Sequence, residues 1–428
     1  MFTISYNGDA DFLNKSKRPA SKTENILPSV VEILEKVKTG GDEALKELSL
    51  KFDGFAPENL EVSAQEAAMA ESKVSDELKS AINQAIKNIT LFHESQKEDA
   101  IKKVTTSQGI DCWQKRVAIE KIGIYIPGGS APLFSTVLML AIPARIAGCK
   151  EIVLCSPPRT EGEINPVVLY CAHLLGVTRI FRTGGAQAIA AMAYGTQSVP
   201  KVYKIFGPGN SFVTVAKQLV SGNDTAIDMP AGPSELAVVA DNSTPAEYAA
   251  ADLLSQCEHG ADSQVGLFVS SEKKKDEIIA EALKQLEMLP RKDIAAKSFA
   301  NSFAVVTENN SMSVKLTNLW APEHLILDVE DAQNLAEEVV NAGSVFIGKY
   351  ACESAGDYAS GTNHTLPTNG AALAYSGLNL DSFTKKITFQ TINEQGIKNI
   401  GPAVEIMAEA EQLQAHKNAV SVRLKNLK

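Results

Sequence analysis

The sequence has no pair of cysteines spaced as CxxC and no long apolar run. Its six cysteines are scattered over 428 residues, so we expect free thiols rather than a disulfide framework. No segment reaches the ~18 uninterrupted apolar residues of a membrane span. The first residues lack a basic stretch followed by an apolar one, so we expect no signal peptide and a cytoplasmic protein.

The sequence has fewer basic residues than acidic ones. Lys and Arg number 41 against 51 Asp and Glu, which gives a formal net charge of −10. Phosphate backbones need a basic face, so this balance argues against nucleic acid as the main partner. No repeat of solenoid period and no low-complexity segment is present. The length and the 44% hydrophobic content are typical of a globular protein with two or more domains.

Short apolar runs alternate with helix-length amphipathic runs along most of the chain. This alternation is typical of doubly wound parallel sheets, and two such series predict two α/β units. The expected strands of the first series lie at 121–126, 151–155, 178–183 and 202–206, and those of the second at 235–240, 264–270, 303–307 and 344–348.

The two ends of the chain lack this alternation. The first twenty residues are polar and irregular, whereas 23–96 predict two long amphipathic helices that pack on one of the α/β units. Beyond about residue 376, we expect a short strand at 386–390, a helix at 402–413 and a closing strand at 420–424. Small tails of this kind often cross to another subunit.

The segment QCEHG at 256–260 ends a helix-like run and precedes a strand-like one. Gln256 and His259 are three apart, so on a helix they share one face. An amide oxygen beside an imidazole nitrogen suits a metal or a polar ligand, and a surface turn is the alternative. Asp357, in a loop of small residues, could add a hard oxygen donor to a set that zinc accepts. The role of His364, in the same loop, stays open.

Three glycine-rich turns each follow an expected strand and precede an expected helix. They are PGGSAP from Pro127, TGGAQ from Thr183 and GPGNS from Gly207. Such turns present backbone N–H groups to an anion, and at one sheet edge they would share a ligand site. None completes GxGxxG, because Phe212 stands at the third glycine position after Gly207. They are either tight turns or the site of an unconventionally bound dinucleotide.

Two further pairs of residues carry titratable groups. Glu323 and His324 are adjacent, and their different ordinary pKa values suit acid–base chemistry near neutrality. An exposed Glu beside a half-buried His is the alternative. Glu411 and His416 lie five apart near a helix end, which by itself indicates a solvated charge cluster.

Taken together, these segments resemble the histidinol dehydrogenase family. The matching blocks run in order from about Tyr125 to the C-terminal region, whereas residues before about 116 match only in general character. Several unrelated blocks would have to agree by accident, so the resemblance is specific. The blocks are GIYIPGGSAPLFSTVLML, GGAQAIAAMAYGT, KIFGPGNSFVTVAKQLV, IDMPAGPSELAVVAD, DLLSQCEHGADSQV, APEHL, ESAGDYASGTNHTLPT and EQLQAHKNAV.

The resemblance implies an NAD-linked oxidoreductase with one zinc ion per subunit. The implied zinc ligands are Gln256, His259, Asp357 and His416. The implied catalytic pair is Glu323 and His324, and the implied NAD contacts are Tyr125, Gln187 and Asn210. The substrate would be held by the zinc ligands and the catalytic pair, together with Ser234 and Glu411.

The implied reaction is the oxidation of L-histidinol, through bound histidinaldehyde, to L-histidine, with two NAD molecules used in succession. This is the last step of histidine biosynthesis. The implied fold is α/β, with two incomplete Rossmann-like parallel-sheet domains and small tail domains in a domain-swapped homodimer. The expected domains are 21–125 with 233–377, 126–232 on the NAD side, 1–20 with 378–406 as an arm, and 407–428 as a tail reaching the partner's site.

Three other functions would use part of the same residues. A relative that oxidises another small alcohol, such as a sulfonated diol, would keep zinc and NAD. Glu411 with His416 suits a cationic amine better than a sulfonate. A zinc hydrolase with Glu323 as base would leave the three glycine turns unexplained, and a non-catalytic binding module would need none of the acid–base residues.

Overall fold

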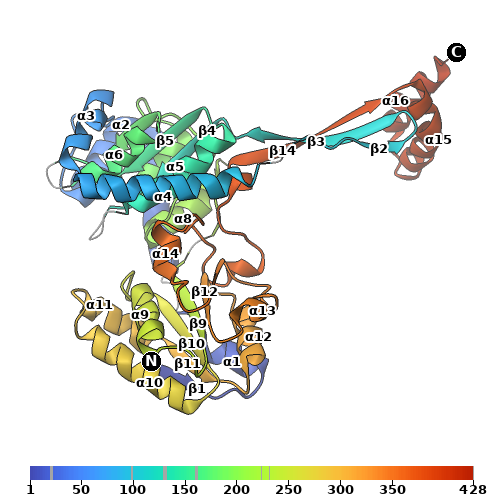
Figure 1. Ribbon diagram of the computed structural model, residues 1–428. Helices are drawn as coiled ribbons and strands as arrows, with labels where there is room; N and C mark the ends of the chain where they lie inside the picture. Colours follow the sequence, from blue (N-terminus) through green and yellow to red (C-terminus); the bar gives the residue numbers. More distant parts are fainter. Residues whose placement is uncertain are drawn as a thin grey trace.

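The protein has two lobes, each built on a parallel sheet, and a long ribbon that projects from one of them (Figure 1). The computed structural model describes residues 1–19, 23–97, 100–128, 133–159, 162–222, 224–230 and 232–427. The two parallel sheets confirm the predicted α/β class. In this part of the chain, no helix is long and apolar enough to cross a membrane.

The lower lobe in Figure 1 contains a six-stranded parallel sheet in the order β1-β11-β10-β9-β12-β13. The strands are β1 (Phe2–Ile4), β9 (Glu235–Ala240), β10 (Gln264–Val269), β11 (Phe303–Val306), β12 (His324–Asp328) and β13 (Ser344–Ile347). The helices of this part are α1 (Asp9–Lys15), α9 (Ala246–Cys257), α10 (Glu272–Leu286), α11 (Lys292–Ala300), α12 (Asn310–Trp320), α13 (Ala332–Ala336) and α14 (Glu353–Tyr358). β9 and β10 are buried along their whole length, as is typical of parallel strands with helices on both faces.

The upper lobe contains a five-stranded parallel sheet in the order β6-β5-β4-β7-β8. The strands are β4 (Lys121–Tyr125), β5 (Glu151–Ser156), β6 (Arg179–Arg182), β7 (Lys204–Phe206) and β8 (Ala226–Ile227). The helices are α2 (Thr23–Asp53), α3 (Ala64–Met69), α4 (Asp76–Glu94), α5 (Phe134–Ala147), α6 (Pro166–Leu174), α7 (Gly185–Tyr194) and α8 (Ser211–Ser221), with a short 3-10 helix at Ala70–Lys73. Figure 1 shows α4 lying along one face of this lobe.

The two long N-terminal helices pack on the upper lobe. α2 contacts α7 and α8, and α4 contacts α5. Ile82 and Ile89 of α4 are buried, and the side chain of Ser75 caps this helix by accepting the Leu78 N–H. The packing differs from the predicted grouping of 21–125 with 233–377, because an apolar stripe shows that a helix packs but not on which sheet. The other expected domain boundaries stay a prediction.

Both chain ends are more regular than expected. The polar first twenty residues include β1, which pairs with β11 at the edge of the six-stranded sheet, and α1. In the tail, α15 (Glu394–Ala410) is followed by α16 (Gln414–Lys425). The predicted closing strand at 420–424 is therefore wrong, because five residues of alternating polarity are too few to distinguish a strand from one side of a short helix.

An antiparallel ribbon carries the two tail helices away from the lobes (Figure 1). β14 (Thr384–Ile392) pairs with β3 (Ile110–Ala118) over its whole length, and β2 (Val104–Ser107) pairs with the far end of β3. Two 3-10 helices, Ala371–Leu373 and Leu380–Phe383, precede β14. The β2–β3 hairpin was absent from the predicted strands, and β14 extends the expected strand at 386–390 at both ends.

Helix α9 carries a half-buried carboxyl group. Burial and the nearby Asp328 raise the pKa of Asp252 to about 7. Asp328 ends β12, and burial together with Asp241 raises its pKa to about 6. The folded chain therefore keeps protons that the unfolded chain releases at lower pH, so these groups reduce stability as the pH rises.

Replacing Asp252 with asparagine should stabilise the fold, and more strongly at higher pH. The free-energy penalty of ionising Asp252 grows as the pH rises from its ordinary pKa of 3.8 to its folded pKa of about 7. Asparagine removes that penalty. We expect the melting temperature to rise at pH 8 by at least about 2–4 °C, the shift that 1 kcal/mol gives a large domain, with a smaller gain at pH 5. Asp276→Asn, at an exposed position of α10, is the matched control, and an equal gain at both pH values would contradict this cause.

Candidate functional site

A buried pair of titratable side chains lies where β9 and β12 begin. Glu323 and His324 are only 7% and 3% exposed. The Glu235 N–H donates to Oε2 of Glu323 at 2.9 Å, and the Glu235 carbonyl oxygen lies 3.3 Å from Nδ1 of His324. The alternative of an exposed Glu beside a half-buried His is therefore wrong, because both side chains are buried.

Three carboxylates surround the imidazole of His324. Its Nδ1 lies 3.8 Å from Glu323 Oε2 and 3.9 Å from Glu353 Oε1, and its Nε2 lies 3.5 Å from Asp357 Oδ1. Burial alone would lower the pKa of His324, but the three carboxylates outweigh it and raise that pKa to about 10. Burial raises the pKa of Glu323 to about 8 and the pKa of Glu353 well above its ordinary range. These raised pKa values favour the protonated forms of His324, Glu323 and Glu353 near neutral pH.

The end of α9 faces α14 beside this pair. His259, Glu353 and Asp357 each offer one ligand atom, and these atoms lie within 4.8 Å of one another. Gln256 is fully buried. With its amide turned so that the nitrogen faces Glu353, that nitrogen donates to both carboxylate oxygens at 2.5 and 3.1 Å. Such nitrogen and oxygen donors are a set that zinc accepts.

The local fold explains why these donors meet. α9 ends at Cys257, but the His259 N–H still donates to the Gln256 carbonyl at 3.3 Å, so both residues stay in one turn as the spacing predicts. Glu353 was not among the predicted site residues. It stands four before Asp357 on α14, and this spacing places both carboxylates on one helix face, a signal that the sequence contained.

His364 connects this group to the upper lobe. Its Nδ1 lies 2.9 Å from the Asp357 carbonyl oxygen, and its Nε2 lies 3.4 Å from Thr136 Oγ1 on α5. The residue whose role stayed open thus sits between the lobes, against the carboxylate cluster. Ser234 precedes Glu235 at the same end of β9, where its carbonyl accepts the Gln264 N–H at 3.2 Å.

Glu411 and His416 lie far from this group within one chain. Glu411 directly follows α15 and His416 lies in α16, and both are exposed at the distal end of the ribbon (Figure 1). A single chain therefore brings together Gln256, His259 and Asp357, but not His416.

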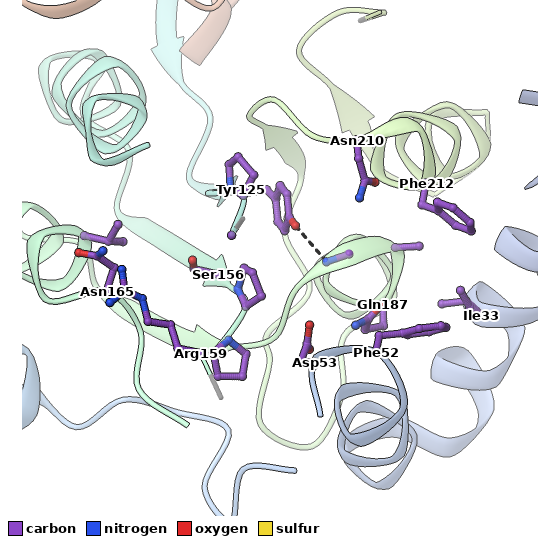
Figure 2. Close-up of a pocket in the computed structure, with 17 residues that line it drawn as sticks. Ile33, Phe52, Asp53, Tyr125, Ser156, Arg159, Asn165, Gln187, Asn210 and Phe212 are labelled. Atoms are coloured by element: carbon purple, nitrogen blue, oxygen red, sulfur yellow. Dashed lines mark hydrogen bonds between the residues drawn. The ribbon is translucent and has the colours of Figure 1, made fainter. Parts of the chain in front are cut away.

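A cavity of about 640 Å³ lies in the upper lobe at the carboxyl ends of its strands. Tyr125, Gln187 and Asn210 all line it, from three different elements (Figure 2). The Gly185 N–H donates to the Tyr125 hydroxyl at 3.0 Å, and burial raises the pKa of Tyr125 to about 12, so the phenol stays neutral. The structure places this cavity at the sheet edge where the glycine turns predicted a shared ligand site.

Two charged residues that the sequence did not single out also line this cavity. Asp53 ends α2, and burial raises its pKa to about 6. Arg159 follows β5 and is exposed at the cavity (Figure 2). Both come from segments without a recognisable motif, so their position depends on tertiary packing.

A buried ion pair holds the turn at Gly207. Lys217 of α8 lies 2.5 Å from Asp228, and the side chains are 4% and 2% exposed. Lys217 donates to the Gly207 carbonyl, and Asp228 accepts the Gly207 N–H, both at 2.8 Å. Gly207 has φ 122, and a Cβ there would lie 2.2 Å from the Tyr125 carbonyl oxygen, so only glycine fits. In the PGGSAP turn, residues 129–132 lie outside the described residues.

Comparison with known proteins decides the family. A family model described as histidinol dehydrogenase matches residues 16–424. The chain belongs to the histidinol dehydrogenase family. It is similar to histidinol dehydrogenase of Bacteroides thetaiotaomicron, with 58% identity over 100% of both chains. The crystal structure of histidinol dehydrogenase from Elizabethkingia anophelis superposes with a TM-score of 0.96 at 52% identity, covering 99% of this chain and 98% of that one. The predicted family and its oxidoreductase class are thereby confirmed.

In this member of the histidinol dehydrogenase family, Lys217→Met should destabilise the lobe that contains the cavity. The change leaves Asp228 buried without its cation, which typically costs about 3–5 kcal/mol. Urea unfolding should show a lower midpoint. The double variant Lys217→Met/Asp228→Asn should recover most of the loss, because the amide oxygen can still accept the Gly207 N–H. An unchanged midpoint for Lys217→Met would show that the ion pair does not hold the turn.

Proposed function

We propose that this oxidoreductase converts L-histidinol, through bound histidinaldehyde, to L-histidine, using zinc and NAD, in the cytoplasm. The observation that carries the proposal is the buried Glu323–His324 pair next to the donors of α9 and α14. The relatives' names support the substrate, and the cavity of the upper lobe supports a separate place for the cofactor.

Gln256, His259 and Asp357 would hold zinc, with His416 supplied by a second chain. Their nitrogen and oxygen atoms are ligands that zinc accepts. The excess of buried carboxylates around His324 also favours a bound cation, because like charges in one buried space repel. When bound, zinc positions the imidazole and amino nitrogens of the substrate.

The cavity of the upper lobe would hold NAD through Tyr125, Gln187 and Asn210. Asn210 caps α8 by accepting the Val213 N–H at 3.1 Å. The first turn of such a helix presents backbone N–H groups that suit a phosphate. When bound, NAD accepts the hydride in each of the two oxidations.

In the first oxidation, Nε2 of His324 takes the hydroxyl proton as the carbon-bound hydride leaves. The Glu235 carbonyl can only accept a hydrogen bond and so favours the proton of a neutral His324 on Nδ1, with Nε2, which faces Asp357 at 3.5 Å, as the base. The carboxylates raise the pKa of this imidazole, and a bound cation that offsets them would allow the neutral form near pH 7.

In the second oxidation, Glu323 takes a proton from water as its oxygen adds to the aldehyde carbon. The hydrated aldehyde then gives up the second hydride and becomes a carboxylate. A pKa near 8 suits a general base that works near neutral pH. The overall reaction consumes one alcohol, one water and two NAD⁺, and yields one carboxylate, two NADH and three protons. Enclosing both steps in a buried site protects the reactive aldehyde.

The ribbon and tail helices would complete the site of a second chain. Apolar side chains are exposed along them, including Ile406 at 69%, Met407 at 64% and Leu413 at 43%. Contiguous exposed apolar surface marks interaction sites. We therefore propose a homodimer with exchanged tails, in which Glu411 and His416 reach the partner's cluster and Glu411 binds the substrate's cationic amine with Ser234.

Removal of the metal tests the proposed chemistry. Dialysis against a strong chelator should reduce NADH formation from histidinol by at least ~100-fold, because the metal contributes several kcal/mol, and zinc should restore it. The intact enzyme should form two NADH per histidinol consumed. Other amino alcohols and diols serve as comparison substrates. Full activity without metal would contradict the zinc assignment, and faster turnover of a sulfonated diol would contradict the substrate.

A mixed dimer tests tail exchange. His416→Ala and Glu323→Gln should each be inactive alone. A purified heterodimer of the two variants should regain about half the wild-type activity per dimer, because one site then receives an intact body and an intact tail. A heterodimer of Glu323→Gln with His324→Gln is the matched control and should stay inactive. Absence of recovery in the verified first heterodimer would show that each site is built from one chain.

A further inference from the structure

Glu235 uses its backbone and its side chain for different purposes. Its N–H donates to Glu323 Oε2 and its carbonyl faces His324 Nδ1, so one residue contacts both members of the pair. Its carboxylate is 2% exposed and accepts the Asn369 N–H at 2.8 Å. Arg18 neutralises this carboxylate through two of its nitrogens, with Nη2 at 2.8 Å from Oε2.

The same guanidinium also contacts the segment that leads into Glu323. Arg18 Nη2 donates to the Trp320 carbonyl at 2.6 Å, and the guanidinium carbon lies 4.8 Å from the centre of the Trp320 ring. The next residue, Ala321, has φ 51, a conformation that costs energy for any residue with a side chain. Arg18 therefore ties the start of β9 to the strained turn between α12 and β12.

Arg18 is itself held by its neighbours in the chain. The Trp320 Nε1–H donates to the Ser16 carbonyl at 3.2 Å, and Gln264 Nε2 donates to the Lys17 carbonyl at 3.3 Å. Trp320 is only 1% exposed. Residues 16–18 thus form a strap, fixed on both sides, that presents the guanidinium to Glu235.

We propose that the Arg18–Glu235 ion pair is the device that positions Glu323 and His324. It fixes the Glu235 peptide groups, so that one orients the Glu323 carboxylate and the other orients the His324 ring through Nδ1. Nε2 of His324 is buried and faces Asp357 Oδ1 at 3.5 Å, on the side of the proposed ligand set. This inference rests on the proposed function, because the roles of Glu323 and His324 do.

The Arg18→Met variant, measured in the zinc-loaded enzyme, tests the positioning role of the Arg18–Glu235 ion pair. Partners that orient a catalytic group typically contribute 10–100-fold, so kcat should fall by about that factor. The KM for histidinol and the zinc content should stay as in the wild type. Arg18→Lys should restore part of kcat, because it returns the charge but not the two-pronged contact. If Arg18→Met does not fold, Arg18→Met/Glu235→Gln removes the unpaired buried charge and should show the same fall in kcat.

Arg182→Met is the matched control for a loss of stability. Arg182 pairs with Glu66 in the upper lobe, with side chains 11% and 35% exposed, and contacts none of the site residues. Its melting temperature should fall while kcat is unchanged. An unchanged kcat in Arg18→Met, or a fall in kcat that Arg182→Met reproduces, would overturn the positioning role. A fall in kcat that is fully explained by a lower zinc content would also overturn the positioning role.

Imidazole nitrogen NMR gives a readout that does not depend on turnover. His324, assigned with the help of His324→Gln, should show different ring-nitrogen shifts in Arg18→Met and in the wild type at the same pH, because its Nδ1 contact with the Glu235 carbonyl is disturbed. Identical shifts in both proteins would overturn the inference even if histidinol is not the substrate. A wild-type enzyme that does not oxidise histidinol would instead count against the proposed function alone.

Discussion

The repulsion among buried carboxylates around one imidazole governs the site. Glu323, Glu353 and Asp357 share a space of low dielectric with His324, where each unpaired negative charge is costly. The folded chain meets this cost with retained protons, with backbone N–H groups such as that of Glu235, and with the amide of Gln256. A site with such an excess of carboxylates favours cationic ligands, and this preference comes from the protein's own side chains.

The two lobes use opposite ends of their parallel strands for the proposed function. The cavity of the upper lobe lies at the carboxyl ends of its strands, as doubly wound folds lead one to expect. The carboxylate cluster lies at the other end of its sheet, where β9 and β12 begin. Helix α5 joins the two regions, because the β4–α5 connection lines the cavity with Pro127 and Gly128 while Thr136 contacts His364.

Motifs and periodicity predicted much of this arrangement. The alternation of apolar runs gave most strands of both sheets, and the glycine turns predicted a ligand site where the cavity lies. Ligand sites of doubly wound folds are expected at the carboxyl ends of the strands. This expectation could not place the Glu323–His324 pair, because the pair lies at the beginning of β12. The Arg18–Glu235 contact joins residues 217 apart, so no local pattern signals it. The packing of α2 and α4 likewise depends on which sheet offers a complementary face.

The strap at residues 16–18 gives the beginning of the chain an unexpected importance. The family match begins only at residue 16, and every motif that indicates function lies between Tyr125 and His416. A protein translated from a later start codon would keep all of those motifs and would be judged complete from them. It would nevertheless lose the edge strand β1 and the only guanidinium that the described residues place against Glu235. Under the proposed positioning role, such a shortened protein would keep the Glu323–His324 pair but not the contact that fixes Glu235 beside it.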